Sequence, residues 1–146
     1  MYLIVLGAGP EGASLIDLAL KDGHEVALIE EDVERARKVL KSHDINVFQG
    51  DIAKGNLLEE ASADRADALI AATSDDSANL MAMFLGKEYE IKTLISMVNQ
   101  SNHQSLFERL GVQVLTNPEM IIAKSLYGMM EDSDNEYKLN HGELSD

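Results

Sequence analysis

Short apolar runs alternate with segments of helical periodicity along this 146-residue chain. Such alternation, with short connections, is typical of a parallel sheet with crossover helices on both faces. The sequence therefore predicts an α/β fold with one doubly wound, parallel six-stranded sheet in the order 3-2-1-4-5-6. The expected strands are 2–6, 25–30, 46–49, 66–72, 92–98 and 112–115, and the expected helices are 10–21, 32–42, 57–61, about 75–89, 102–110 and 118–130.

The first expected strand leads into the turn LGAGPEG, which places glycines at Gly7, Gly9 and Gly12. A strand before this Gly-x-Gly-x-x-Gly pattern and a helix after it are the context of a Rossmann-like dinucleotide-binding turn. Its glycines permit the tight bend, the approach of a diphosphate and close helix packing. Glu30 ends the second expected strand, 18 residues after Gly12, where a carboxylate accepts from ribose hydroxyls. The sequence predicts a nucleotide site here; a tight turn without ligand is the alternative.

The acidic run Glu30, Glu31 and Asp32 surrounds the expected ribose position. Because a 2′-phosphate would be repelled there, NADP is disfavoured, and NAD or an adenine nucleotide remains. Glu31 and Asp32 are also at the start of a helix, and helix capping is the favoured interpretation for these two.

Polar residues follow two further expected strands, at the sheet edge where ligands of this fold bind. Asp51 either accepts from an adenine amino group or caps the turn that follows it. Thr73 ends the fourth strand beside the crevice where the strand order reverses. For Asp75 and Asp76, capping of the next helix is favoured over a role in the site.

Several longer stretches resemble one known family. They are VLGAGPEGASL, GHEVALIEED, VFQGD, ADALIAATSDDSANLMAMFLGK and LFERLGVQVLTNPEMIIA, within residues 1–130. Together they are similar to the RCK/KTN domain of TrkA-N type, the nucleotide-binding regulatory domain of potassium channels and transporters. The resemblance implies a site around Gly7, Gly9, Gly12, Glu30, Asp51 and Thr73. The full set of expected cofactor-binding residues is Gly7, Ala8, Gly9, Pro10, Glu11, Gly12, Glu30, Glu31, Asp51, Ile52 and Thr73.

The chain departs from this family at positions that are often basic. Pro10 and Glu11 stand in the glycine turn, Glu31 follows the ribose acid, and Met97 takes the place of an arginine in the fifth strand. Each change removes positive charge from the phosphate side, so we expect NAD, AMP or ADP as ligand and ATP less than these.

Composition limits the function further. The chain has no cysteine and a net charge of −14, which disfavours thiol chemistry and binding to nucleic acid. Its four histidines are dispersed, so no metal site is expected, and only His103 begins a helix near the crevice. No apolar run is long enough to span a bilayer, and no basic leader precedes the first strand. We expect a cytoplasmic regulatory module and no enzyme.

Two alternatives remain at this point. The chain is also compatible with the dinucleotide-binding part of an oxidoreductase, or with the N-terminal domain of a fusion to a phosphoesterase-type hydrolase. The expected organisation is a nucleotide-binding domain over 1–130 and an acidic tail or linker over 131–146, which carries six acids and one lysine. Apolar residues on more than one face of the last helix predict a dimer of identical or related subunits, and the resemblance implies a membrane potassium transporter subunit as partner.

Overall fold

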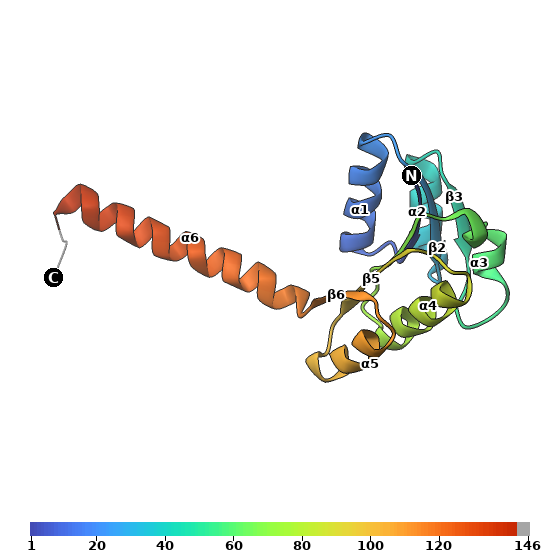
Figure 1. The fold of residues 1–146 in the computed structure, drawn as a ribbon. Helices are drawn as coiled ribbons and strands as arrows, with labels where there is room; N and C mark the ends of the chain where they lie inside the picture. Colours follow the sequence, from blue (N-terminus) through green and yellow to red (C-terminus); the bar gives the residue numbers. More distant parts are fainter. Residues whose placement is uncertain (143–146) are drawn as a thin grey trace. The chain divides into compact units, whose positions relative to one another are not determined.

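The computed structural model describes residues 1–142, and contacts divide the chain into two units, residues 1–116 and residues 117 onward, which are described in turn. In the first unit, six parallel strands form one sheet in the order β3-β2-β1-β4-β5-β6 (Figure 1). The predicted fold class and strand order are therefore confirmed. The strands are β1 Tyr2–Leu6, β2 Glu25–Glu30, β3 Asn46–Gln49, β4 Ala68–Ala71, β5 Thr93–Val98 and β6 Gln113–Thr116.

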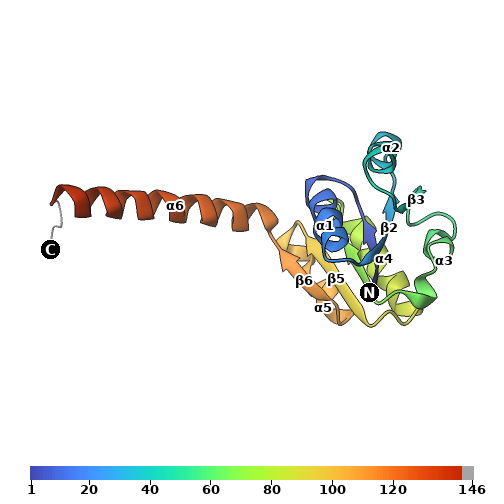
Figure 2. The same ribbon diagram turned by 90° about the horizontal axis from the view of Figure 1, so that it is seen from above.

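Helices cover both faces of this sheet (Figure 2). They are α1 Pro10–Lys21, α2 Val33–Ser42, α3 Leu57–Glu60, α4 Asp76–Glu88 and α5 Gln104–Arg109, with 3-10 turns at Ala63–Arg65 and Ser101–His103. Successive side chains of a strand point to opposite faces. Accordingly, Leu3 and Val5 of β1 pack with Ile16 of α1, while Ile4 packs with Met83 of α4. Every residue of β1 is buried, as expected for a central strand covered on both sides.

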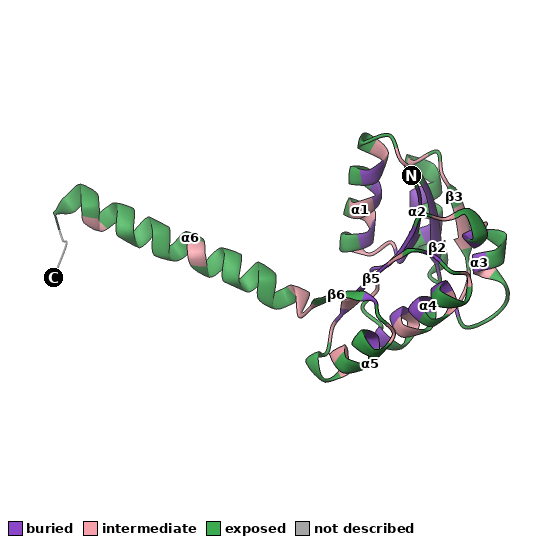
Figure 3. Cartoon of the chain, in the orientation of Figure 1, coloured by how far each residue is buried: buried purple, intermediate pink, exposed green. Residues whose placement is uncertain are grey.

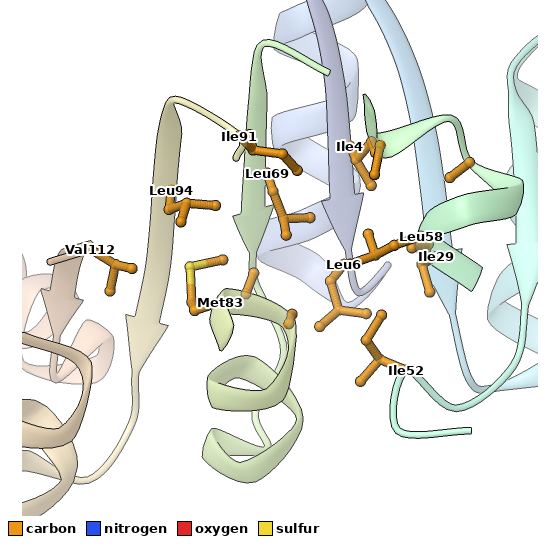
Figure 4. Packing of buried hydrophobic residues seen from close by; sticks show 14 of the residues in the cluster. Ile4, Leu6, Ile29, Ile52, Leu58, Leu69, Met83, Ile91, Leu94 and Val112 are labelled. Atoms are coloured by element: carbon orange, nitrogen blue, oxygen red, sulfur yellow. The ribbon is translucent and has the colours of Figure 1, made fainter. Parts of the chain in front are cut away.

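The larger of the two cores lies between the sheet and α3, α4 and α5 (Figure 4). Ile4 and Leu69 come from adjacent strands at its centre, and Met83 meets them from α4. Ile52, in the loop after β3, and Leu58 of α3 extend this core toward the β3 side of the sheet. The loop after β3 is thereby held against the sheet, beside the carboxyl ends of the strands.

Two element boundaries differ from the prediction for local reasons. The expected strand over 66–72 is shorter because the N–H of Ala66 donates to the carbonyl of Ala63 and closes a 3-10 turn at 3.1 Å. The expected helix over 102–110 is divided into a 3-10 turn and α5. That division lies where His103 and the residues just before it bind Asp76.

The second unit is built on one helix, α6, which runs from Pro118 to His141. The predicted helix end at Met130 is therefore wrong, and residues 131–141 of the predicted acidic tail or linker are helical. An ion pair of 2.7 Å between Lys138 and Asp134, one turn apart, supports this polar segment, and Gly142 ends the helix with a positive φ of 67°. Residues 143–146 of the predicted tail lie outside the described residues.

No residue of α6 is buried (Figure 3). Its first half nevertheless carries seven exposed large apolar side chains, namely Met120, Ile121, Ile122, Leu126, Tyr127, Met129 and Met130. Among residues 1–142, no helix combines the length and the apolar character needed to span a bilayer.

Candidate nucleotide-binding site

The main cavity of the first unit has a volume of about 800 Å³ and lies at the carboxyl ends of β1, β2 and β4. The strand order reverses between β1 and β4, because the chain adds β2 and β3 on one side of β1 and β4 to β6 on the other. In open α/β sheets ligands bind at such a switch point. Eight of the expected site residues line this cavity: Gly7, Gly9, Pro10, Glu11, Glu30, Glu31, Ile52 and Thr73. Ala8, Gly12 and Asp51 belong to the surrounding structure instead of the cavity wall.

The glycine turn between β1 and α1 needs its first and third glycines for packing. Gly7 has a φ of +100°, which L side chains rarely adopt, and its N–H donates to the carbonyl of Ile29 at 2.9 Å. A Cβ at Gly12 would lie 1.8 Å from the Gly7 carbonyl oxygen. Only glycine at position 12 therefore lets α1 start this close to the turn.

Gly9 differs from the other two glycines of the turn. It is the N-cap of α1 and has an ordinary φ of −66°. A Cβ there would have no neighbour closer than 3.9 Å, so position 9 opens into the cavity. The first N–H groups of a helix lack partners within it and attract anions. The turn thus leaves room for a phosphate group at Gly9, and the residues present fit the diphosphate of a nucleotide.

Glu30 is the ribose-side carboxylate expected from the sequence, and it is 6% exposed. Its Oε1 accepts from the N–H of Ala8 at 2.9 Å, and its Oε2 accepts from the N–H of Asp32 at 3.2 Å. These two bonds fix the orientation of the carboxylate and connect the glycine turn to the end of β2. Since each carboxylate oxygen accepts two hydrogen bonds, one position on each oxygen remains for ribose hydroxyls.

Asp32, Asp51 and Asp75 each had two interpretations, capping of a helix or turn and a place in the nucleotide site. Asp32 caps α2, because its Oδ1 accepts from the N–H of Arg35 at 2.8 Å. Asp51 caps its own turn by accepting from the N–H of Ala53 at 2.9 Å. Asp75 caps α4 through the N–H groups of Ser77 and Ala78. Asp32 and Asp75 also line the cavity, so capping and cavity lining are not exclusive.

Thr73 lines the cavity, but its hydroxyl is used inside the protein. The hydroxyl donates to Oδ1 of Asn79 at 2.6 Å and accepts from the N–H of Asp75 at 3.1 Å. Asn79 is fully buried and donates to the carbonyls of Thr73 and Met97 at 3.0 and 3.1 Å. Asn79 therefore holds the ends of β4 and β5 together behind the cavity wall.

Asp76 forms a second polar connection, between α4 and the loop after β5. Its Oδ1 accepts from the N–H and the side-chain amide of Asn99, and its Oδ2 accepts from the N–H of Gln100 and from His103. Burial opposes the ionisation of Asp76. The hydrogen bonds from Asn99, His103 and Gln100 outweigh burial and hold the pKa of Asp76 below its usual value. Helix capping was the favoured interpretation for Asp76, and it is wrong.

The four histidines lie apart from the cavity wall. His24 contacts the N-terminal amine, His43 pairs with Asp17 at 2.5 Å, and His141 bonds to the carbonyl of Tyr137. His103 faces Asp76 and is not among the residues that line the cavity. Among residues 1–142, no group of three or more His, Asp or Glu side chains is placed to hold a metal ion.

The cavity is strongly acidic. Six carboxylates line it, from Glu11, Glu30, Glu31, Asp32, Glu34 and Asp75. Within the described residues, one cationic side chain lines it with them, that of Arg35. Sequence reasoning missed Arg35, although its place two residues into α2, just beyond the ribose-side acid, was the signal that could have found it.

The glycine turn, the held carboxylate of Glu30 and the switch point define a domain of the doubly wound, dinucleotide-binding class. Over residues 3–118 the chain matches the TrkA-N domain family, and it belongs to that family. The resemblance seen in the sequence is thereby confirmed.

Curated relatives carry the same family name. The Trk system potassium uptake protein TrkA homolog of Methanothermobacter thermautotrophicus is 34% identical over 123 residues, which cover 84% of this chain and 57% of the relative. The homolog of Pyrococcus abyssi is 32% identical over 133 residues, covering 87% of this chain and 59% of the relative. The chain thus spans somewhat more than half the length of these relatives.

Solved structures share the fold at low identity. The TrkA-N domain of the inner membrane protein ybaL from Escherichia coli has a TM-score of 0.78 at 16% identity, over 88% of this chain and 95% of that one. The Kef C-terminal domain of Shewanella denitrificans in its AMP-bound form has a TM-score of 0.70 at 22% identity, over 97% of this chain and 93% of that one. The GsuK channel bound to NAD has a TM-score of 0.69 at 19% identity, over 78% of this chain and 21% of that one. GsuK has also been solved bound to ADP.

Proposed function

We propose that this chain is the nucleotide-binding regulatory domain of a potassium uptake system or channel. Membership of the TrkA-N family and the potassium uptake proteins among its relatives support this function. The observation that carries the nucleotide site is the geometry of Glu30, which Ala8 and Asp32 orient at the edge of a glycine-turn cavity. The partner is a membrane potassium transporter subunit, and the domain lies on its cytoplasmic side.

The proposed ligand is NAD(H), AMP or ADP, bound with the diphosphate or phosphate at Gly9 and the ribose at Glu30. Related folds have been solved with NAD, AMP and ADP. Six carboxylates against one guanidinium in the cavity disfavour the extra phosphate of NADP and the triphosphate of ATP. Asp51 takes part through the conformation of its loop, since its side chain caps the turn.

The proposed domain senses the nucleotide and does not transform it. The residues of the first unit that line the cavity include no His, Tyr, Lys or Cys, the usual proton donors beside a nicotinamide ring. The relatives named for potassium uptake favour regulation over the two alternatives, an oxidoreductase part and a hydrolase fusion.

Calorimetric titration with NAD, NADH, ADP, AMP, NADP and ATP tests this proposal. We expect NAD(H), AMP or ADP to bind at least tenfold more tightly than NADP, about 1.4 kcal/mol. Gly9→Val places a branched side chain in the space for the phosphate, and its Cβ has no neighbour closer than 3.9 Å, so it should abolish binding while the fold remains. Equal affinity for NADP would refute the ligand preference, and unchanged binding by folded Gly9→Val would place the ligand elsewhere.

A dimer is the proposed means of regulation, with the apolar first half of α6 as the contact between copies or related subunits. Nucleotide in the cavity would favour one arrangement of the paired domains over another, and the membrane partner would respond to that arrangement. This mechanism requires that the ligand bind the two arrangements with different affinity.

A further inference from the structure

Arg35 is the cationic side chain that lines the cavity, and the proposed function leaves it without a role. It lies in the first turn of α2, where its N–H donates to the capping carboxylate of Asp32 at 2.8 Å. That bond and the one from Asp32 N–H to Glu30 connect the start of α2 directly to the ribose-side acid. Hydrogen bonds from backbone N–H groups to the carboxylates of Asp32 and Glu30 therefore hold the backbone of Arg35 relative to the ribose-side acid.

The guanidinium of Arg35 extends from α2 toward the glycine turn. Its Nη1 is 3.9 Å from the point that a Cβ on Gly9 would occupy. Position 9 is where the turn opens into the cavity, so the cation lies near the amino-terminal end of α1, at the proposed phosphate position. Helix N–H groups and a guanidinium close to one another form a pair of donors suited to phosphate oxygens.

Arg35 makes no side-chain ion pair within residues 1–142, although carboxylates surround it. The neighbouring Arg37 pairs with Glu34 at 2.8 Å, and Arg65 pairs with Glu25 at 2.8 Å. The guanidinium of Arg35 is thus free to bind an anion. Pro10, Glu11 and Glu31 offer no positive charge at the glycine turn or beside the ribose, which leaves Arg35 to neutralise a phosphate.

We propose that Arg35 binds the diphosphate of the nucleotide and makes the site selective for ligands with two linked phosphates. The inference rests on the proposed nucleotide site and deepens it. A planar guanidinium contacts two oxygens at once, so it distinguishes a diphosphate from an uncharged nucleoside. One cation among six carboxylates matches the two or three charges of NAD or ADP better than the four of ATP.

The test compares Arg35→Gln with the matched control Arg37→Gln, which changes the same residue type two positions along α2 outside the cavity wall. NAD, ADP, AMP, adenosine and NADP are titrated against each. We expect Arg35→Gln to weaken the binding of NAD and ADP by about 10–100-fold, which is the range that a hydrogen bond to a charged group contributes. The affinity for adenosine should stay within about twofold of that of the unchanged chain. Arg37→Gln should bind every ligand as the unchanged chain does.

Two further measurements exclude a merely structural role. Arg35→Lys keeps the charge but loses the planar fork, so it should recover part of the lost affinity for ADP. The difference in affinity between the unchanged chain and Arg35→Gln should also shrink as salt is added, because Arg35 is exposed and salt screens its charge. Urea midpoints of both variants should stay at the value of the unchanged chain.

The outcomes are distinct. If the unchanged chain binds NAD or ADP and Arg35→Gln binds them equally well, the role of Arg35 is refuted while the nucleotide site stands. An equal loss of affinity for adenosine would also overturn the role of Arg35. A loss of affinity confined to NADP would overturn it too, because Arg35 would then contact the 2′-phosphate and not the diphosphate. If the unchanged chain binds none of the five ligands, both this inference and the proposed function fail.

Discussion

At the scale of single residues, Gly9 and Gly12 have opposite requirements although they belong to one motif. A Cβ at Gly12 would lie 1.8 Å from the carbonyl oxygen of Gly7, whereas position 9 has no neighbour closer than 3.9 Å. Within one motif the fold therefore requires glycine at position 12, whereas position 9 leaves open the space proposed for the phosphate.

We predict that Gly12→Ala destabilises the chain by about 3 kcal/mol or more, although alanine normally stabilises a helix relative to glycine. Gly9→Ala should change the free energy of unfolding by less than about 1 kcal/mol. Urea denaturation of the two variants measures both values. Equal destabilisation by the two substitutions would contradict the geometry of the turn.

Asp76 gives a prediction that depends on pH. Four hydrogen bonds to its carboxylate hold its pKa below the value of about 3.9 in an unfolded chain. The folded state therefore binds fewer protons, so this contribution to stability is full above about pH 4 and is lost as the pH falls through the folded-state pKa.

Asp76→Asn should lower the free energy of unfolding by about 3 kcal/mol at neutral pH, because it removes the charge and sets an amide N–H₂ against N–H donors. The difference from the unchanged chain should narrow steadily below about pH 4. Thermal unfolding between neutral and acidic pH measures it. A difference that is constant across this range would show that the charge of Asp76 is not what stabilises the loop after β5.

The residue scale also shows what a sequence can reveal about a site. The glycine turn and Glu30 were predictable because their roles follow from local spacing along one strand–turn–helix unit. The position of Arg35 in the first turn of α2, just beyond the ribose-side acid, was a signal for a residue near the site. Its contact with the cavity depends on where α2 places the side chain relative to Gly9, which the sequence does not give. Asp76 was assigned to capping, since its bonds to residues 23–27 positions later leave no local pattern.

At the scale of elements, strands were more predictable than the last helix. β1, β2 and β3 have the expected bounds because glycine or polar residues end each apolar run. The helix α6 continues 11 residues past its expected end, through a polar segment without amphipathic periodicity. Its helix formers, its Asp134–Lys138 pair and the Gly142 cap are signals that the acidic composition obscured.

The exposed apolar half of α6 predicts self-association. Ile122 and Met129 are 59% and 64% exposed, and they lie about two turns apart on the helix. We expect a dimer by light scattering at micromolar concentration and a monomer for Ile122→Glu and Met129→Glu, since a buried unpaired carboxylate opposes association. Leu139→Glu, near the polar end of α6, is a control that should remain dimeric. A chain that is monomeric with and without nucleotide would exclude the dimer mechanism.

At the scale of the whole molecule, charge is the dominant property. The chain carries 26 acidic and 12 basic residues, and six of the carboxylates meet around one cavity. Like charges destabilise the compact state, and added salt screens their repulsion over about 10 Å at 0.1 M.

We therefore predict that the ligand-free chain becomes more stable as NaCl rises from about 0.05 M to about 0.5 M, the range in which the screening length falls below about 10 Å. Scanning calorimetry measures the change in Tm. A Tm independent of salt would mean that cavity repulsion contributes little to the stability of this fold.

The place of β1 in the sheet has a consequence for how the chain is made. Of the six strands of the sheet this one is synthesised first, yet it lies between β2 and β4, and in its pairing with β4 Leu3 lies opposite Ala68. A nascent chain that has emerged only through β3 therefore exposes one complete edge of its central strand. That edge stays unpaired until the chain has emerged through β4, about 20 residues further on, which takes about one to four seconds at about 5–20 residues per second. During this interval the ribosome-bound chain is open to strand pairing with other chains, and a chaperone that binds extended apolar segments would have its target at Tyr2–Leu6.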